Sequence, residues 1–267
     1  MADQVDRRWA LILGASSGFG EATARELARR GLDICGVHLD RRAGMAHVDE
    51  ITRAIRACGR DALFFNVNAA DHEKRRHVLD ALAARIAEDG GGSVQVLMHS
   101  LAFGSLNPLI DADGSRLATP AQLSMTLEVM AQSLVYWVQD ARARGLLVRG
   151  SRVFAMTSAG ASRVWPSYGV VSAAKAALEA YVRQLAVELG ATGVTVNAIR
   201  AGVTDTPALR KIPGGEWMAQ QAAVRNPSGR LTATDDVARV IAMLAGPDAQ
   251  WITGATIGVD GGEDLVA

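Results

Sequence analysis

The chain of 267 residues contains little cysteine, and neither sign of charge is in excess. Its two cysteines, Cys35 and Cys58, form no CxxC pair and have no accompanying histidine cluster, so neither a disulfide framework nor a zinc site is expected. His72 and His77 lie five positions apart on a polar helix and are expected to be solvated rather than to bind a metal. Lys plus Arg and Asp plus Glu both number 28, which leaves no basic excess for nucleic acid. We therefore expect neither a metal nor a nucleic-acid partner.

Long hydrophobic runs are also missing. No apolar stretch approaches membrane-spanning length, and the first ten residues lack the pattern of a secretory signal. There is no proline- or serine-rich linker, internal repeat or low-complexity tract. Hydrophobic residues make up 49% of the chain, which is enough for a sizeable core. The sequence therefore predicts a single soluble, cytoplasmic domain over residues 1–267, with no membrane contact.

Short apolar runs alternate with helical periodicity along the whole chain. Strands are predicted at residues 9–13, 32–39, 61–67, 94–99, 152–157, 194–199 and 255–259. Helices are predicted at residues 21–30, 46–58, 72–88, 120–144, 170–190 and 234–245. Strands that are apolar throughout and separated by helices imply an α/β fold: one doubly wound parallel sheet with helices on both faces. Residues 201–230 are expected to be irregular, with a substrate-binding lid at about residues 203–230.

A glycine turn, Gly14-x3-Gly18-x-Gly20, lies between the first strand and the first helix. Glycines at this place let the backbone approach a pyrophosphate, which the helix N-terminus stabilises. The spacing differs from the usual G-x-G-x-x-G, so an ordinary glycine-rich turn stays an alternative. The same residues match the G-x-S-x-G elbow of hydrolases, with Ser16 as nucleophile. The last histidine is His99, so no histidine follows in the C-terminal part and hydrolysis is not expected.

Tyr168 and Lys175 lie seven positions apart among small and apolar residues. Both side chains usually titrate far above neutral pH. Against a bound cofactor, however, a tyrosine hydroxyl can donate to a developing oxyanion while a lysine holds a sugar and lowers the phenol pKa. The alternative is a half-buried tyrosine at a helix start and a solvated lysine. The alanines that flank Lys175 favour a closely packed helix over a solvated one.

Taken together, these motifs resemble the short-chain dehydrogenase/reductase family. The matching pieces occur in family order over nearly the full length: the glycine turn, Asn66-Val67, Lys175, Asn197-Ala198, Ala201-Gly202-x3-Thr206, and Thr253-Gly254 through Val259-Asp260-Gly261-Gly262. The resemblance implies a Rossmann fold, an NAD(P)H-dependent oxidoreductase and a homotetramer. Leu134, Val135, Trp137 and Val138 are expected to give the long helix an apolar surface for subunit association.

The resemblance also implies which residues bind the cofactor. They lie in the glycine turn and after successive strands: Gly14, Ser16, Ser17, Phe19 and Gly20 for the phosphates and adenosine ribose, Asn66 and Val67 for the adenine, Ser100, Leu101, Ala102 and Lys175 for the cofactor ribose, and Gly202, Val203 and Thr206 on the nicotinamide side. Counting places His38 where an acidic residue usually reads the ribose 2′-hydroxyl, which would leave Asp40 outside the site. Arg41 and Arg42 then favour NADPH, with NADH still possible.

Departures from the common carbonyl-reducing pattern resemble the enoyl-acyl-carrier-protein reductase branch, in its third, bacillus-like type. The common Tyr-x3-Lys would put the phenol at Val171, and the usual asparagine of the long helix aligns with Met130. His99-Ser100-Leu101-Ala102 and Ala201-Gly202 also replace the common residues. In enoyl thioester reduction, hydride goes to Cβ while charge develops on a carbonyl oxygen two carbons away, so the donor must lie further from the nicotinamide.

The resemblance therefore implies reduction of a 2-enoyl thioester on acyl carrier protein, in fatty-acid or related biosynthesis. Ser158 stands where carbonyl-reducing relatives have a catalytic serine, and it is either a pocket wall or a direct contact. An acyl pocket could be formed by Phe103, Trp165, Leu209, Ile212, Trp217 and Met218. Two alternatives stay open: a ketone or alcohol enzyme that uses Ser158 and Tyr168, and a nucleotide-binding protein without catalysis.

Overall fold

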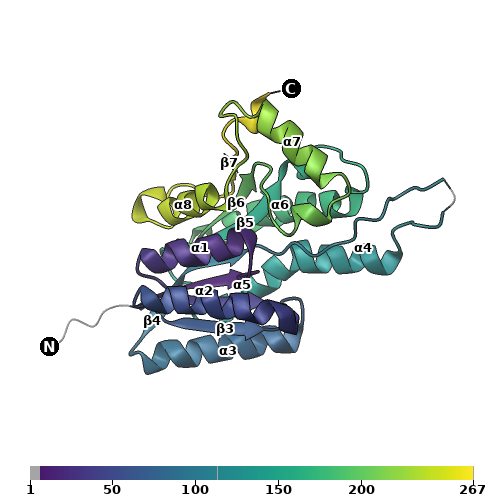
Figure 1. Ribbon diagram of the computed structural model, residues 1–267. Coiled ribbons are helices and arrows are strands. Elements are labelled where there is room, and N and C mark those ends of the chain that lie inside the picture. The colour runs from purple at the N-terminus through teal and green to yellow at the C-terminus, as the bar shows by residue number, and fades with distance from the viewer. Residues whose placement is uncertain (1–6, 113, 267) are drawn as a thin grey trace.

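The computed structural model describes residues 7–112 and 114–266, which form one parallel sheet between two helical layers (Figure 1). Among these residues, seven strands pair in the order β3-β2-β1-β4-β5-β6-β7, and every pairing is parallel. The strands are β1 (Arg7–Leu13), β2 (Asp33–His38), β3 (Ala62–Asn66), β4 (Gly92–His99), β5 (Arg152–Ser158), β6 (Thr195–Ala201) and β7 (Thr256–Val259). The predicted doubly wound fold is confirmed.

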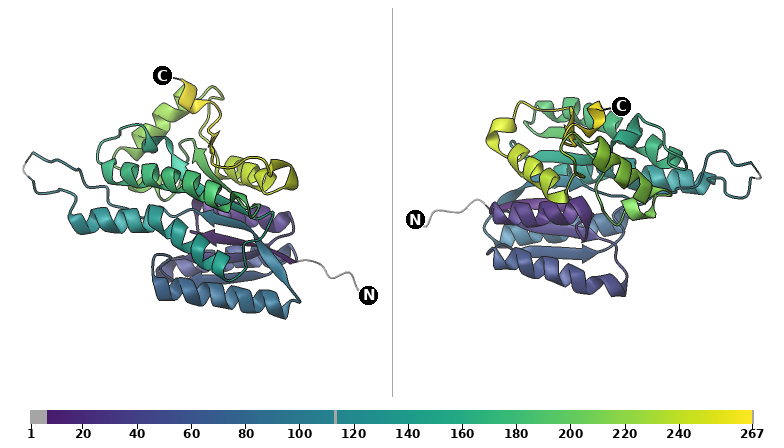
Figure 2. Two further views of the ribbon diagram at one scale, coloured as in Figure 1. Left: turned by 180° about the vertical axis from the view of Figure 1, so that it is seen from behind. Right: turned by 45° about the horizontal axis from the view of Figure 1, so that its top comes forward.

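Helices cover both faces of the sheet, as Figures 1 and 2 show from opposite sides. One face carries α1 (Gly18–Arg29), α2 (Met45–Ala57) and α8 (Thr234–Leu244), and the other carries α3 (His72–Glu88), α5 (Ser133–Ala143) and α6 (Gly169–Gly190). Along β1, Leu11 and Leu13 pack into one core while Ala10 and Ile12 pack into the other. Successive strand residues point to opposite faces, so a strand buried on both sides must be apolar throughout.

Two predicted segments differ from the structure. The predicted helix at residues 120–144 is divided into α4 (Pro120–Leu127) and α5 by a π-helical turn at Glu128–Gln132, where the Ser133 hydroxyl bonds the carbonyl of Val129. The predicted irregular segment at residues 201–230 contains α7 (Gly215–Arg225). Gly214, in the left-handed conformation, immediately precedes that helix, so the glycine pair marks a helix start rather than a continuing loop.

Three of the four apolar residues predicted for subunit association are buried in the core instead, and Val135 is partly buried beside them. Leu134 and Trp137 are fully buried, Val138 is nearly so, and the Trp137 indole donates to the carbonyl of Ala69 at 2.9 Å. The interpretation was wrong because α5 packs this face against α3 and the sheet within one chain. In the described part of the chain, no helix is long and apolar enough to cross a membrane.

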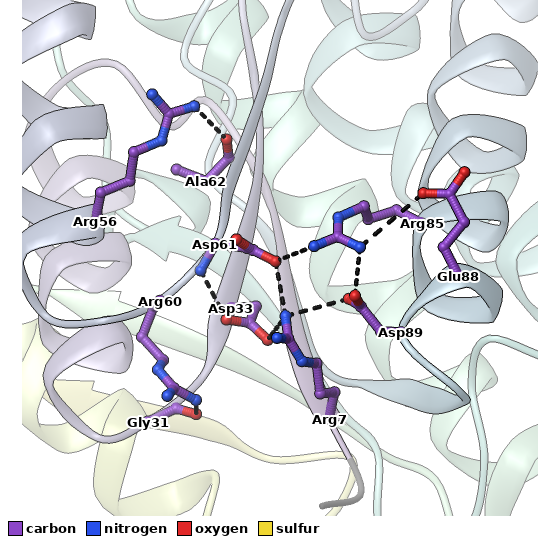
Figure 3. Close-up of polar contacts among 10 residues, drawn as sticks. All are labelled: Arg7, Gly31, Asp33, Arg56, Arg60, Asp61, Ala62, Arg85, Glu88 and Asp89. Atoms are coloured by element: carbon purple, nitrogen blue, oxygen red, sulfur yellow. Dashed lines mark hydrogen bonds and ion pairs between the residues drawn. The ribbon is translucent and has the colours of Figure 1, made fainter.

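A cluster of charged side chains joins the amino ends of the first three strands to the end of α3 (Figure 3). The Arg7 guanidinium lies 2.7 Å from Asp61, 3.2 Å from Asp89 and 3.6 Å from Asp33. Arg85 pairs with both Asp61 and Asp89. Burial alone would raise the pKa of Asp61, but the hydrogen bonds and charges of Arg7 and Arg85 outweigh it and lower that pKa.

We expect Asp61→Asn to lower the melting temperature by about 2–4 °C at pH 7, because a half-exposed ion-pair cluster contributes only about 1 kcal/mol. The lowered pKa of Asp61 means that this stability is present above the usual aspartate pKa and is lost as pH falls through the folded-state value. The difference between the two proteins should therefore shrink in acid. Thermal melts at pH 7 and pH 3 measure it, and an undiminished difference at pH 3 would contradict the electrostatic explanation.

Candidate active site

The glycine turn lies where the strand order reverses, between β1 and its neighbour β4. Gly14 follows β1 in the left-handed conformation, and a Cβ there would overlap the carbonyl oxygen of Ser100, which follows β4. A Cβ at Gly20 would in turn overlap the carbonyl oxygen of Gly14. Only glycine permits both approaches, so the two strand ends and α1 meet closely. Ligands of such sheets bind in the crevice at this reversal.

An imidazole and a carboxylate, from His38 and Asp40, lie together at the end of β2. Asp40 Oδ2 lies 2.9 Å from Nδ1 of His38, and the Asn66 amide exchanges two hydrogen bonds of 2.9 Å with the backbone of Asp40. The Asp40 carboxylate therefore lies against His38, the position at which an acidic residue usually binds the ribose 2′-hydroxyl. Arg41 and Arg42 follow on the surface, and neither has an ion-pair partner within the described residues.

Lys175 is buried, with only 6% of its surface exposed, which confirms the closely packed helix. Its Nζ donates to the carbonyl of Met156 on β5 at 2.6 Å. Burial lowers the pKa of Lys175 to about 8, and the charge of Glu179, one turn further along α6, acts in the opposite direction. Glu179 in turn accepts a hydrogen bond of 2.7 Å from the hydroxyl of Thr157 on β5.

Tyr168 is the residue immediately before α6, which begins one residue earlier than predicted, and its side chain is half-buried. Ser167 precedes it with φ at 62°, the one non-glycine residue with positive φ in the part of the chain that is described. Burial raises the pKa of the Tyr168 phenol, and the nearby Ser158 hydroxyl acts in the opposite direction. The two hydroxyls are neighbours without a well-formed hydrogen bond, since Ser158 Oγ is buried and has no partner among the described residues.

A buried histidine lies next to these groups and was not predicted as a site residue. His99 ends β4, and its Nε2 lies 2.8 Å from the hydroxyl of Ser133, the first residue of α5. Burial, helped by the charge of Lys175, lowers the pKa of His99 to about 3, so the imidazole is neutral at pH 7. Nδ1 has no partner among the described residues. Only the resemblance at residues 99–102 singled this position out, because its partner lies far away along the chain.

A cavity of about 780 Å³ opens beside Tyr168 and Ser158. Five of the six residues predicted for an acyl pocket line it: Trp165, Leu209, Ile212, Trp217 and Met218. Phe103 does not line it and is 61% exposed, because the hydrogen bond from the Ser105 backbone to Thr126 holds that segment on α4. The Trp165 and Trp217 rings stack with centroids 5.7 Å apart.

The predicted cofactor residues are gathered along the carboxyl edge of the sheet, and four of them reach the cavity. Phe19, Gly202, Val203 and Thr206 line it. A Cβ at Gly18 would lie 3.5 Å from Thr206, so the segment after β6 crosses to the glycine turn. The other predicted residues lie outside the cavity: in the glycine turn and the start of α1, at or after the ends of β2, β3 and β4, and, for Lys175, on α6.

These residues fit a nicotinamide dinucleotide. A Cβ would not fit at Gly14 or Gly20 of the glycine turn, the Lys175 ammonium has one backbone acceptor, and the buried hydroxyl of Ser158, a residue that lines the cavity, has no partner among the described residues. The first feature admits phosphates, and the other two offer donors to sugar and carbonyl oxygens. No cluster of His, Cys, Asp and Glu suited to a metal ion occurs within residues 7–112 and 114–266.

Comparison with known proteins finds similarity over nearly the whole chain. A family model described as "Enoyl-(Acyl carrier protein) reductase" matches residues 14–263. The cis-4-hydroxycyclohexanecarboxylate dehydrogenase of Sinomonas cyclohexanicum is 31% identical, with 100% of both chains covered. The 1-cyclohexenylcarbonyl-CoA reductase of Streptomyces collinus is 29% identical, with 98% of this chain and 88% of that protein covered. A short chain dehydrogenase from Burkholderia cenocepacia J2315, solved in complex with NADP, is 27% identical at a TM-score of 0.80, covering 97% of this chain and 98% of that one.

Proposed function

The chain belongs to the short-chain dehydrogenase/reductase family and is an NAD(P)-dependent oxidoreductase, and on that premise we propose that it reduces the carbon–carbon double bond of a 2-enoyl thioester. The observation that carries the proposal is the place of the phenol. Tyr168 lines the cavity from the residue before α6, whereas Val171, four positions before Lys175, is apolar and buried. The donor is thus displaced along the chain from the place that suits a ketone.

In the proposed reaction, Tyr168 donates a hydrogen bond to the thioester carbonyl oxygen, on which the enolate charge develops. The raised pKa of its phenol keeps that proton in place at neutral pH. Lys175 holds the cofactor ribose with the protons that Met156 does not accept. The apolar cavity wall excludes water from the acyl chain. A bound nicotinamide nucleotide would supply the hydride to Cβ. Tyr168 would give its proton to the enolate oxygen and regain one from solvent, and the enol would then tautomerise to the saturated thioester.

Similar proteins support this substrate class. The Streptomyces collinus relative is named for 1-cyclohexenylcarbonyl-CoA, and this compound is a 2-enoyl thioester. The family description names acyl carrier protein. We therefore propose an acyl thioester carried on acyl carrier protein, in fatty-acid or related biosynthesis.

A second candidate is oxidation or reduction at a hydroxyl or ketone carbon. The unpartnered Ser158 hydroxyl beside Tyr168 favours it, because two hydroxyls could bind one carbonyl oxygen. The dehydrogenase of Sinomonas cyclohexanicum is named for a hydroxylated substrate.

One substrate panel separates the two candidates. We expect a crotonyl thioester to be reduced with a kcat/KM at least about tenfold above that of a 3-ketoacyl thioester, since only the favoured reaction aligns hydride and donor. We also expect NADPH to be preferred over NADH, because Arg41 and Arg42 carry free charge near the ribose end. Loss of nicotinamide absorbance measures both comparisons. Faster turnover of the ketoacyl thioester would favour the second candidate.

The remaining features of the proposal follow from the family. Residues 1–267 act as one catalytic domain, and about residues 203–230, with α7 among them, form the lid over the substrate. We propose a cytoplasmic homotetramer by resemblance to the family. The core position of Leu134 and Trp137 removes those two residues from its interface.

A further inference from the structure

Two neighbouring carboxylates, Glu263 and Asp264, reach into the cavity wall from the segment that follows β7. Figure 1 shows this segment beside α7. Each carboxylate binds groups from other parts of the chain, and we call the pair the 263–264 clasp. The proposed reaction gives neither carboxylate a role.

Glu263 is 95% buried, with 5% of its surface exposed, and it joins the lid helix to the segment after β6. Its Oε2 accepts a hydrogen bond of 3.0 Å from the backbone N–H of Val203, and its Oε1 lies 3.2 Å from the Arg225 guanidinium at the end of α7. Gly202 is packed so tightly against Glu263 and Thr232 that a Cβ would not fit. The position of Val203 is therefore set by a buried, charge-assisted hydrogen bond.

Asp264 joins two arginines that also line the cavity. The Arg163 guanidinium lies 2.8 Å from both the carboxylate and the carbonyl oxygen of Asp264, and the Arg200 guanidinium lies 3.1 Å from the carboxylate. Arg163 belongs to the loop that leads from β5 to Tyr168, and Arg200 lies on β6. All three side chains line the cavity. Asp264 therefore holds these two arginine side chains in the cavity lining.

We propose that Glu263 and Asp264 are positioning residues with separate tasks. Glu263 holds Val203 and α7 in the arrangement that binds the nicotinamide, and Asp264 holds Arg163 and Arg200 in the arrangement that admits the acyl chain. The proposal rests on the proposed placement of Val203 beside the nicotinamide. Each carboxylate acts through the backbone or side chains that it binds rather than by touching substrate.

Glu263→Gln keeps an oxygen for the Val203 amide but removes the charge opposite Arg225. We expect the dissociation constant for the nucleotide to rise about tenfold, as the loss of a charge-assisted hydrogen bond predicts. Asp264→Asn should raise KM for the thioester about tenfold by the same reasoning and leave the nucleotide dissociation constant within about twofold. Glu88→Gln removes the same charge from the exposed end of α3, outside the cavity and the lid, and is the matched control, with no expected change.

Amide hydrogen exchange without nucleotide gives a readout that does not depend on catalysis. In Glu263→Gln, exchange should accelerate at residues 202–206 and in α7, while the strands of the sheet keep wild-type rates. If exchange became faster throughout the chain, Glu263 would only stabilise the fold as a whole, and the proposal would be overturned. Unchanged exchange together with unchanged nucleotide affinity would also overturn it. If the wild-type protein bound neither NADPH nor NADH, the proposed function would fail, and the exchange rates would still decide the role of Glu263.

Discussion

Replacing Tyr168 with phenylalanine is expected to lower kcat for a crotonyl thioester by about 10²–10⁴-fold, the range that one positioned proton donor contributes. The ring would still fill its half-buried place before α6, so the change removes the hydroxyl and little else. The nucleotide dissociation constant should stay within about twofold, because Lys175, not Tyr168, is proposed to hold the ribose. Single-turnover rates and fluorescence titration with NADPH measure the two quantities separately.

Tyr181→Phe provides the matched control for this substitution. Tyr181 lies on the same helix and packs against the core rather than the cavity, so loss of its hydroxyl should leave the rate unchanged. Full activity in Tyr168→Phe would show that another group stabilises the enolate. Ser158 would then be the next candidate, since it lines the same cavity and its hydroxyl has no partner among the described residues.

The layered fold is predictable because its signal is local and repeated. β1 has to be apolar at every position from Trp9 to Leu13, since alternate residues enter different cores. A run of this kind between a polar start and a glycine turn has few other interpretations. The parallel order follows from the helices that connect the strands.

The predictions for α5 and α7 were wrong because the local sequence pattern of each is compatible with two structures. The apolar face of α5 has the same composition whether it meets a second subunit or α3 of its own chain, and only the packing of Trp137 distinguishes them. In α7, the pattern was hidden by the glycine pair Gly214-Gly215, which usually indicates a loop. The π-helical turn at Glu128–Gln132 interrupts a segment whose sequence has no periodic signature of the interruption.

The polar contacts of the candidate site could be predicted only in part. The motifs identified Tyr168 and Lys175, but their environment comes from distant segments, such as His99 beside the charge of Lys175. The 263–264 clasp has no local signal at all. Glu263 and Val203 are 60 positions apart, and an acidic pair after a glycine turn ordinarily indicates a solvated end.

Replacing Lys175 with methionine is expected to lower kcat/KM at least about 100-fold and to raise the nucleotide dissociation constant at least about tenfold. The substitution removes the donor proposed for the ribose and the positive charge that makes the Tyr168 phenol a better donor. The same change should stabilise the nucleotide-free protein at pH 7. Burial lowers the pKa of Lys175 to about 8, so the folded state carries a penalty for the charged amine.

That penalty is present in full below pH 8 and is relieved as pH rises from about 8 toward the usual lysine value, where the folded protein holds a neutral amine. We therefore expect the melting temperature of Lys175→Met to be roughly 5 °C higher than that of the wild-type protein at pH 7. The offsetting loss is small, because the substitution leaves only the Met156 carbonyl without its donor. The difference in melting temperature should diminish in alkali.

For the wild-type protein, kcat/KM should fall as pH rises through about 8, because the pH dependence of kcat/KM reports groups of the free enzyme. Nucleotide affinity should fall over the same range. A less stable Lys175→Met protein with wild-type nucleotide affinity would mean that the buried ammonium is structural, and the family resemblance would then have misassigned its role.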